Sequence, residues 1–170
     1  PESSAASDVY KRQVLYGASP IADDTIIKAK EIMQCDLFQV YGLTETTGAI
    51  TIMMPEDHDP KRGKLRSCGK ALKGVELKVV DDNGKELKTG EIGQVISKSD
   101  LNMKGYWNKP DATKESIVDG WFYSGDAGYF DEENYLFIHD RVKDMIVSGG
   151  ENIYPAEVEN ALMSLSLIHI

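Results

Sequence analysis

The pattern that most constrains the fold is a change of rhythm at about residue 62. Before it, a short apolar run from Val14 leads into a turn, residues 22–33 space their apolar side chains helically, and Leu37–Tyr41 is apolar and partly β-branched. Two early acidic residues in the helical segment suit a helix N-terminus. This order predicts the end of a parallel α/β sheet, with the loop 41–48 at the carboxyl end of a strand, where such sheets bind ligands.

After this point the chain contains short strands separated by turn residues. Asp81–Gly84 holds an Asn-Gly pair, a strong hairpin signal, and it lacks the later glutamate and alternate ligands of a calcium loop. We therefore expect a plain hairpin there, within a small antiparallel barrel or sheet. The strands predicted for this part are residues 75–80, 90–96, 123–130 and 135–139.

The last part predicts the beginning of an α+β unit. A strand is expected to start at residues 143–147, a turn follows at Ser148–Gly150, and Pro155 suits the first turn of a helix. The predicted fold class is therefore α/β: the end of a parallel sheet, a small antiparallel β subdomain, and the start of an α+β domain.

The two ends have a relation that unrelated protein tails would rarely show. Asp8–Gln13 can be encoded by DNA whose reverse complement encodes Leu165–Ile170, as in a translated sequencing adapter. We expect residues 1–13 and 165–170 to be non-native tails around an internal piece of a longer protein. Within it we expect a large-domain part at residues 14–142, with its β subdomain at about 62–140, and a hinge with the start of a small domain at 143–164.

Charge and composition exclude some classes of protein. The net charge of −9 opposes nucleic-acid binding, which needs a basic face. No run is long and apolar enough to span a bilayer, although peripheral membrane contact and a homodimeric parent stay open. Cys35 and Cys68 form no CxxC pair, so a cytoplasmic location is the default. His58, in a polar loop, and His139, in an apolar strand, have no third partner that would indicate a metal site.

Three short motifs contain residues suited to binding a nucleotide. The first is Tyr41–Glu45, which combines Gly, Thr and a carboxylate, as phosphate and magnesium sites do. The second is Ser124–Asp126, whose carboxylate could accept from the hydroxyls of a ribose. The third is Asp140–Asp144, in which Arg141 offers fixed donors and a permanent charge.

Each motif by itself also has a simpler interpretation. The Thr-Glu pair is typical of a helix cap, and Asp126 of an Asx turn. Arg141 could form a surface ion pair with Asp140 or Asp144. Gly105–Trp107 we interpret as a packing motif rather than a chemical one.

Taken together, the order and spacing of these motifs resemble the adenylate-forming superfamily, and within it the acyl-CoA synthetases or fatty-acid–CoA ligases. The resemblance covers nearly all of residues 14–164 and is carried by YGLTE at 41–45 and by the stretch 120–158. It implies that a carboxylic acid, here a fatty acid, is activated with ATP as an acyl adenylate and passed to CoA, with Mg²⁺ and AMP also bound.

The resemblance also implies a role for each site residue. Tyr41 would stack on adenine beside Gly42, Thr44 would contact the α-phosphate or adenylate, and Glu45 would ligate Mg²⁺. Asp126 would hold the ribose, and Arg141 the ribose and phosphate region. The other implied positions are Gly17, Ala18 and Ser19 against adenine and the acyl group, Lys143 at the interdomain hinge, and Gly149 and Gly150 in the pantetheine passage.

Two further readings remain. One is an amino-acid or aryl-acid adenylation domain that loads a carrier protein, and the other is a non-catalytic nucleotide-binding relative. The family's phosphate loop and catalytic lysine do not occur in residues 14–164, so the resemblance implies an upstream loop, a downstream lysine, and no catalysis by this chain alone.

Overall fold

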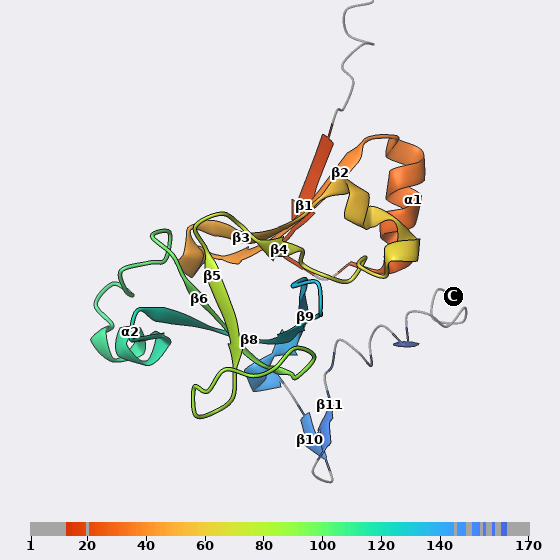
Figure 1. Ribbon diagram of the computed structural model, residues 1–170. Coiled ribbons are helices and arrows are strands. Elements are labelled where there is room, and N and C mark those ends of the chain that lie inside the picture. Colours follow the sequence, from red (N-terminus) through yellow and green to blue (C-terminus); the bar gives the residue numbers. More distant parts are fainter. Residues whose placement is uncertain are drawn as a thin grey trace, which may run out of the picture.

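The structure of the protein is a computed structural model that describes residues 13–19, 21–144, 146–148 and 151–153, and the single positions 155, 158, 161 and 162. These residues form a four-stranded sheet, a five-stranded sheet and a two-stranded hairpin (Figure 1). The expected mixed α/β class is confirmed. The predicted tails, 1–13 and 165–170, fall outside the described residues except for Gln13.

The four-stranded sheet has the order β1-β2-β3-β4. β1 and β2 are parallel, with Gln13 opposite Asp36 and Gly17 opposite Val40, whereas β3 and β4 join in antiparallel fashion. The predicted strand, helix and strand are therefore present, and the chain then turns back along the same sheet. The elements are β1 (Gln13–Gly17), α1 (Asp23–Met33), β2 (Asp36–Leu43), β3 (Gly48–Met53) and β4 (Lys70–Ala71).

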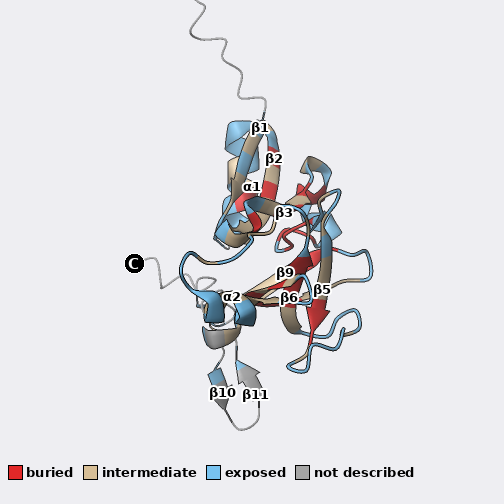
Figure 2. Cartoon of the chain, turned by 90° about the vertical axis from the view of Figure 1, so that its left-hand side faces the viewer, coloured by how far each residue is buried: buried red, intermediate tan, exposed pale blue. Residues whose placement is uncertain are grey.

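Helix α1 covers this sheet through one apolar position above all. Ile26 is buried and packs against Leu37 of β2 and Leu65. Asp23 and Asp24 occupy the first turn, where the helix dipole favours negative charge. Gln34 ends the helix in the left-handed conformation with φ of 47°. The outer face of α1 is exposed (Figure 2).

Two 3₁₀ turns, Pro55–His58 and Pro60–Arg62, lie in the segment that was expected to be a polar loop. His58 is only 1% exposed, so the prediction of a polar-loop histidine is wrong. Its Nδ1 bonds the Met54 carbonyl at 2.9 Å, and its Nε2 bonds the Tyr16 hydroxyl at 3.0 Å. Burial lowers the pKa of His58, which suits a neutral ring that accepts from Tyr16.

The five-stranded sheet is antiparallel throughout. β6 lies between β5 and β8, and β8 pairs along its other edge with β7 and β9. The hairpin turn at 81–84 is present, since the Asp81 N–H donates to Lys85 and its carboxylate accepts from the Asn83 N–H. The elements are β5 (Glu76–Val80), β6 (Gly93–Lys98), α2 (Pro110–Ser116), β7 (Ile117–Val118), β8 (Trp121–Phe130) and β9 (Leu136–Arg141).

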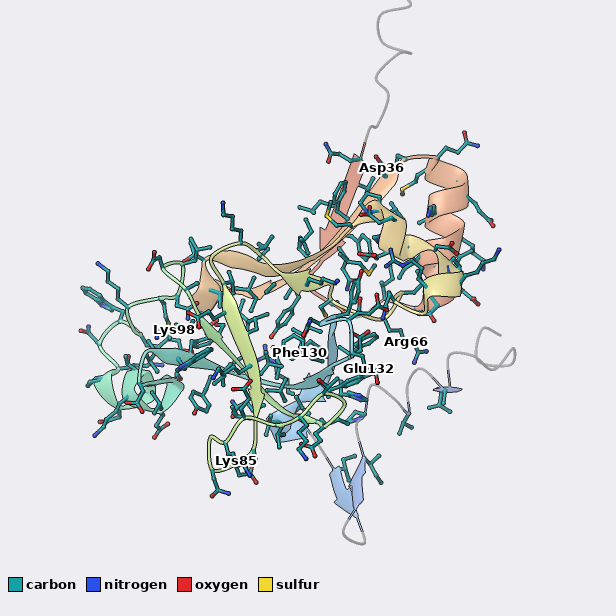
Figure 3. The ribbon with its side chains drawn as sticks, in the orientation of Figure 1. Asp36, Arg66, Lys85, Lys98, Phe130 and Glu132 are labelled. Atoms are coloured by element: carbon teal, nitrogen blue, oxygen red, sulfur yellow. The ribbon has the colours of Figure 1, made fainter. Side chains whose placement is uncertain are left out.

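The core of this sheet centres on Val79, Val95 and Leu136, with Tyr41 of β2 packed against it. Tyr41 therefore belongs to one sheet and contacts the interior of the other. Phe130 at the end of β8 is half-buried, and Figure 3 shows Lys85 extending outward from the hairpin turn. This arrangement brings the end of β2 to the middle of β8 and so positions the site described below.

Several predicted boundaries are wrong. Tyr41–Leu43 are not in a loop but continue β2, so only residues 44–47 connect it to β3. The strand expected at 90–96 begins at Gly93, because Gly90 is part of a turn with φ of 83°. Residues 142–144 form a 3₁₀ turn rather than a strand, and β10 (Ile146–Ser148) then pairs with β11 (Glu151–Ile153). Gly149 and Gly150, in the predicted turn, lie outside the described residues.

Candidate functional site

The centre of the site is the carboxylate of Asp126 in β8. The Tyr41 hydroxyl donates to its Oδ2 at 2.5 Å, and the Arg141 Nε lies 3.0 Å from its Oδ1. Asp126 is 6% exposed. Three elements therefore supply one side chain each: the consecutive strands β8 and β9, and β2, which lies far from them in sequence.

The strand register explains why Asp126 and Arg141 meet. Asp126 lies opposite Arg141 in the β8–β9 pair, and a register shift follows at Ala127/Gly128. The Ser124 hydroxyl donates to the Val95 carbonyl and accepts from the Asp126 N–H, which anchors the backbone on β6. Asp126 thus lies within strand β8.

Both simpler interpretations of this part of the site are wrong. The Asp126 carboxylate accepts from Tyr41 and Arg141 rather than from a local turn. The Arg141 guanidinium pairs with Asp126, while Asp140 accepts from the Arg141 backbone N–H at 2.8 Å. Tyr41 and Asp126 are 85 positions apart in sequence, so their hydrogen bond is a long-range contact that neither local interpretation includes.

Burial raises the pKa of both partners in the hydrogen bond between Tyr41 and Asp126. Burial raises the pKa of Asp126, and the Tyr41 hydrogen bond and the Arg141 charge oppose that rise. Burial and the neighbouring Asp126 raise the pKa of Tyr41, so its hydroxyl keeps its proton and remains a donor. An ionised carboxylate has about four acceptor positions. Two of them accept from described residues here, so two acceptor positions remain for further hydrogen-bond donors.

Glu45 lies in the short 3₁₀ turn Thr44–Thr46 between β2 and β3. The helix-cap interpretation of Thr44 and Glu45 is wrong, because Thr46 has that role: its hydroxyl accepts from the Leu43 N–H at 3.0 Å. Thr44 is exposed. Glu45 is half-buried, and its charge raises the pKa of Asp126 as a smaller contribution.

Tyr106 is a residue of this site that the sequence interpretation missed. Its hydroxyl donates to Glu45 Oε1 at 2.8 Å. The neighbouring Trp107 is 89% exposed, so the interpretation of this aromatic as a packing residue is wrong. The available signal was the polar setting, since a tyrosine in a loop of Gly, Lys and Asn has a hydroxyl to satisfy and little apolar surface around it.

The carboxyl end of β1 brings Gly17, Ala18 and Ser19 beside the Tyr41 end of β2. Gly17 is opposite Val40, and a Cβ at Gly17 would lie 2.2 Å from the Val40 carbonyl oxygen. Ala18 has φ of 69° and, like Ser19, is exposed. Gly42 has a similar steric reason, since its Cβ would lie 1.9 Å from the Gly48 oxygen. Because both positions lack a side chain, the neighbouring strands can lie close together there.

Lys143 follows β9 directly, in the 3₁₀ turn Val142–Asp144. Gly149 and Gly150 lie outside the described residues. The structure thus brings together Tyr41, Asp126 and Arg141, with Gly42, Thr44 and Glu45 just after Tyr41 and residues 17–19 at the adjacent strand end. The roles of all these residues, and those of Lys143, Gly149 and Gly150, stay predictions.

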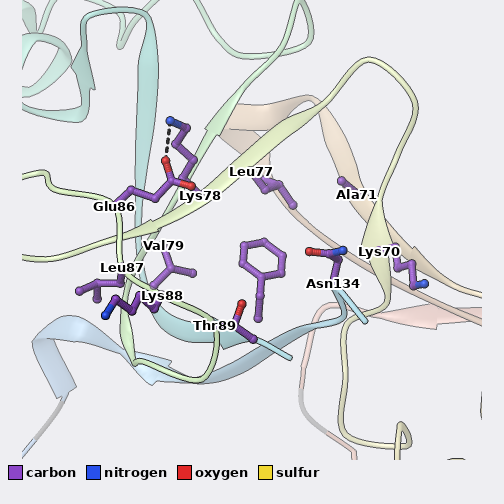
Figure 4. A pocket seen from close by; sticks show the side chains of 11 residues that line it. Lys70, Ala71, Leu77, Lys78, Val79, Glu86, Leu87, Lys88, Thr89 and Asn134 are labelled. Carbon is purple, nitrogen blue, oxygen red and sulfur yellow. Dashed lines mark ion pairs between the residues drawn. The ribbon is translucent and has the colours of Figure 1, made fainter. Parts of the chain in front are cut away.

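A hollow of about 390 Å³ lies elsewhere, at the end of the five-stranded sheet (Figure 4). It is lined by apolar side chains such as Phe130 and by lysines, of which Lys78 pairs with Glu86 at 2.7 Å. None of the predicted site residues lines it.

Among the described helices, none combines the length and apolarity that a membrane crossing requires.

Comparison with known proteins defines the class. The model of the family described as "AMP-binding enzyme" matches residues 3–107, more than half of the chain, so the protein belongs to that family. It is 43% identical over 151 residues to the fatty acid–[acyl-carrier-protein] ligase ScoC of Streptomyces coeruleorubidus, which covers 89% of this chain and 29% of that protein. It is also 42% identical over 153 residues to 2-succinylbenzoate–CoA ligase of Geobacillus kaustophilus, covering 90% of this chain and 30% of that one.

Solved structures agree with this assignment. The O-succinylbenzoate coenzyme A synthetase MenE of Bacillus subtilis, in complex with ATP and magnesium ion, superposes with a TM-score of 0.82 at 37% identity, over 95% of this chain and 34% of that one. The amide bond synthetase McbA of Marinactinospora thermotolerans gives a TM-score of 0.84 at 36% identity, over 91% and 31%. The chain therefore spans about a third of the length of these relatives or less.

Proposed function

We propose that this chain is part of an AMP-forming acid–thiol ligase, which activates a carboxylic acid with ATP as an acyl adenylate and transfers the acyl group to CoA. The observation that carries the proposal is the Asp126 carboxylate, buried, held by Tyr41 and Arg141, and still able to accept two hydrogen bonds. A ribose presents two such hydroxyls side by side. The charge of Arg141 suits the adjoining phosphate.

The other site residues have compatible roles in this proposal. The ring of Tyr41 would face adenine beside Gly42, and Thr44, exposed at the start of its turn, would contact the α-phosphate. Residues Gly17–Ser19 would line the adenine and acyl side. Lys143 would be the hinge toward a small domain, and Gly149 and Gly150 would line the pantetheine passage.

Glu45 fits a magnesium ion. Among the described residues its carboxylate has one hydrogen-bond donor, Tyr106 on Oε1, and Oε2 is left for a ligand. Mg²⁺ in nucleotide sites is typically held by one or two carboxylates, with waters and phosphate oxygens completing the shell. The ion would counter the charge of the triphosphate.

For the acid we propose a fatty acid, as in the name of the relative ScoC and of the long-chain-fatty-acid–CoA ligase FadD13 of Mycobacterium tuberculosis, which is 41% identical over 154 residues. An aryl acid is the second candidate, since 2-succinylbenzoate–CoA ligases are about as similar. ScoC also supports an acyl-carrier protein as an alternative thiol acceptor to CoA.

Calorimetry with AMP tests the nucleotide site on the chain itself. Asp126→Asn should weaken AMP binding about tenfold or more, because a hydrogen bond to a charged group is worth roughly 1.5–3 kcal/mol. Asp82→Asn, on the exposed hairpin turn, is the matched control and should bind like the wild type. Equal affinity of the two variants would remove Asp126 from the nucleotide site.

The hinge is tested in a hybrid enzyme in which residues 14–162 replace the matched segment of MenE. Proline fixes φ near −65° and restricts the residue before it, so Lys143→Pro should hold one domain arrangement. We expect adenylate formation to continue while the CoA step slows strongly. Equal loss of both half-reactions, or of neither, would contradict the hinge assignment.

The unmodified 170-residue chain should show only background pyrophosphate exchange.

A further inference from the structure

The loop before α2 forms three hydrogen bonds with Glu45 and Thr47, in and just after the short 3₁₀ turn. The Met103 N–H donates to the Glu45 carbonyl at 2.6 Å, and the Thr47 hydroxyl donates to the Leu101 carbonyl at 2.6 Å. The third contact is the 2.8 Å hydrogen bond from the Tyr106 hydroxyl to Glu45 Oε1. Two of these contacts fix the backbone of the turn, and only the third acts on the Glu45 carboxylate.

Tyr106 is itself fixed by helix α2. Its backbone N–H donates to the Thr113 hydroxyl at 2.8 Å, and that hydroxyl donates to the Lys109 carbonyl at 2.9 Å. Gly105 has φ of 152°, and a Cβ there would lie 2.7 Å from the Thr113 methyl carbon, so the loop passes close to the helix. The position of the Tyr106 ring is therefore set by α2 and not by Glu45 alone.

We propose that Tyr106 is a positioning residue for the metal site: its hydroxyl holds Oε1 of Glu45, so that Oε2 is presented to the magnesium ion of MgATP. The inference rests on the proposed function, because it takes Glu45 to be the metal ligand. A metal-binding carboxylate that accepts a hydrogen bond from a neighbouring group loses less rotational freedom when the ion binds, and such supporting contacts typically change metal affinity about 10–100-fold.

The competing explanation is that Tyr106 only stabilises the loop. The two explanations differ in one observable, since a stabilising role lowers the unfolding midpoint without changing what the folded protein binds. A positioning role weakens metal-dependent binding in protein that is fully folded, and leaves metal-free AMP binding unchanged, because Asp126, Tyr41 and Arg141 remain in place.

The test compares Tyr106→Phe with Trp107→Phe, the neighbouring exposed aromatic, in the 170-residue chain. AMP binding without metal is measured by calorimetry. ATP binding is then measured across a magnesium series, and Mn²⁺ binding in the presence of ATP by electron paramagnetic resonance. For Tyr106→Phe we expect metal affinity in the ATP complex to fall about tenfold, with unchanged AMP affinity, and for Trp107→Phe no change.

The outcomes separate the inference from the proposed function. Unchanged metal affinity in Tyr106→Phe, or an equal loss of AMP and metal binding, would overturn the role of Tyr106, while AMP binding by the wild-type chain would still support the proposed function. A wild-type chain that binds neither AMP nor ATP would overturn the proposed function and this inference with it. If Tyr106→Phe does not fold, Thr113→Val removes the hydroxyl that anchors the Tyr106 backbone. It should weaken metal binding in the same direction, and unchanged metal binding would count against the proposal.

Discussion

Removing one hydroxyl, in Tyr41→Phe, tests the centre of the site. The substitution keeps the ring that packs against the core of the five-stranded sheet and deletes only the donor to Asp126. Because Asp126 is 6% exposed, water can replace that donor only in part. The Arg141 side chain is 56% exposed, so its ion pair compensates little.

The expected loss of stability follows from these contacts. A hydrogen bond to a charged group contributes roughly 1.5–3 kcal/mol, and partial solvation of the freed oxygen places our expectation near about 2 kcal/mol at neutral pH. For a domain of this size, each kcal/mol shifts the melting temperature by roughly 2–4 °C. Tyr41→Phe should therefore melt about 4–8 °C below the wild type.

The pH dependence has a definite sign. Burial raises the folded-state pKa of Asp126 above its unfolded value, so ionisation of Asp126 destabilises the fold as pH rises through the interval between the two values. Loss of the Tyr41 donor raises the folded pKa further and enlarges that cost. The stability difference between Tyr41→Phe and wild type should thus be smallest near pH 4 and reach its full value at neutral pH.

Urea unfolding of both proteins from pH 4 to 8 measures this difference, with Tyr123→Phe as control, since no hydrogen bond of the Tyr123 hydroxyl is found in the described part of the chain. A difference below about 0.5 kcal/mol, within the range of ordinary surface changes, would refute the reasoning. So would a difference that is equal at pH 4 and pH 7, because the Tyr41 hydroxyl would then not act on an ionising group.

Three further predictions concern stability and reactivity. Ile26→Ala should lower the free energy of unfolding by about 2–5 kcal/mol because it leaves a cavity, whereas Ile32→Ala, at a position 82% exposed, should change it little when measured in urea. Lys64→Met should cost about 1–2 kcal/mol in the same assay, since it removes the Lys64 ion pairs with Asp131 and Glu133 of the β8–β9 turn, and unchanged stability would count against these ion pairs. Burial raises the pKa of Cys68 to about 12. A thiol reagent at pH 8 should therefore modify Cys35 in the native protein and Cys68 only after unfolding. Equal modification rates of the two cysteines in the native protein would contradict the burial of Cys68.

Periodicity and turn residues were sufficient to predict several elements of this fold, but not all of them. The strand, helix and strand of residues 13–43 and the hairpins around residues 81–84 and 131–134 follow from local patterns, because side-chain period and turn propensity act within a few residues. Helix α2 was not expected, since seven residues are too few for a helical repeat. The predicted strand boundaries were also off by a few residues, because so few residues are too short for a pattern to mark where a strand begins or ends.

Motif order was sufficient to indicate the family, but not the contacts among the candidate site residues. Each local alternative for Asp126 and Arg141 was reasonable until the register of β8 and β9 placed them opposite each other and β2 delivered the Tyr41 hydroxyl. Sequence spacing does not report such contacts, because they depend on how two sheets pack.

Tyr106 and His58 show this limit most directly. By sequence one belongs to a packing motif and the other to a polar loop, yet one bonds Glu45 from 61 positions away and the other is buried against Tyr16 from 42 positions away. Local sequence patterns were enough for the strand, helix and strand of residues 13–43, for two hairpins and for the family. Which polar groups are buried together depends on the fold, because a buried donor needs an acceptor and the long-range packing of the chain determines which acceptor lies within reach.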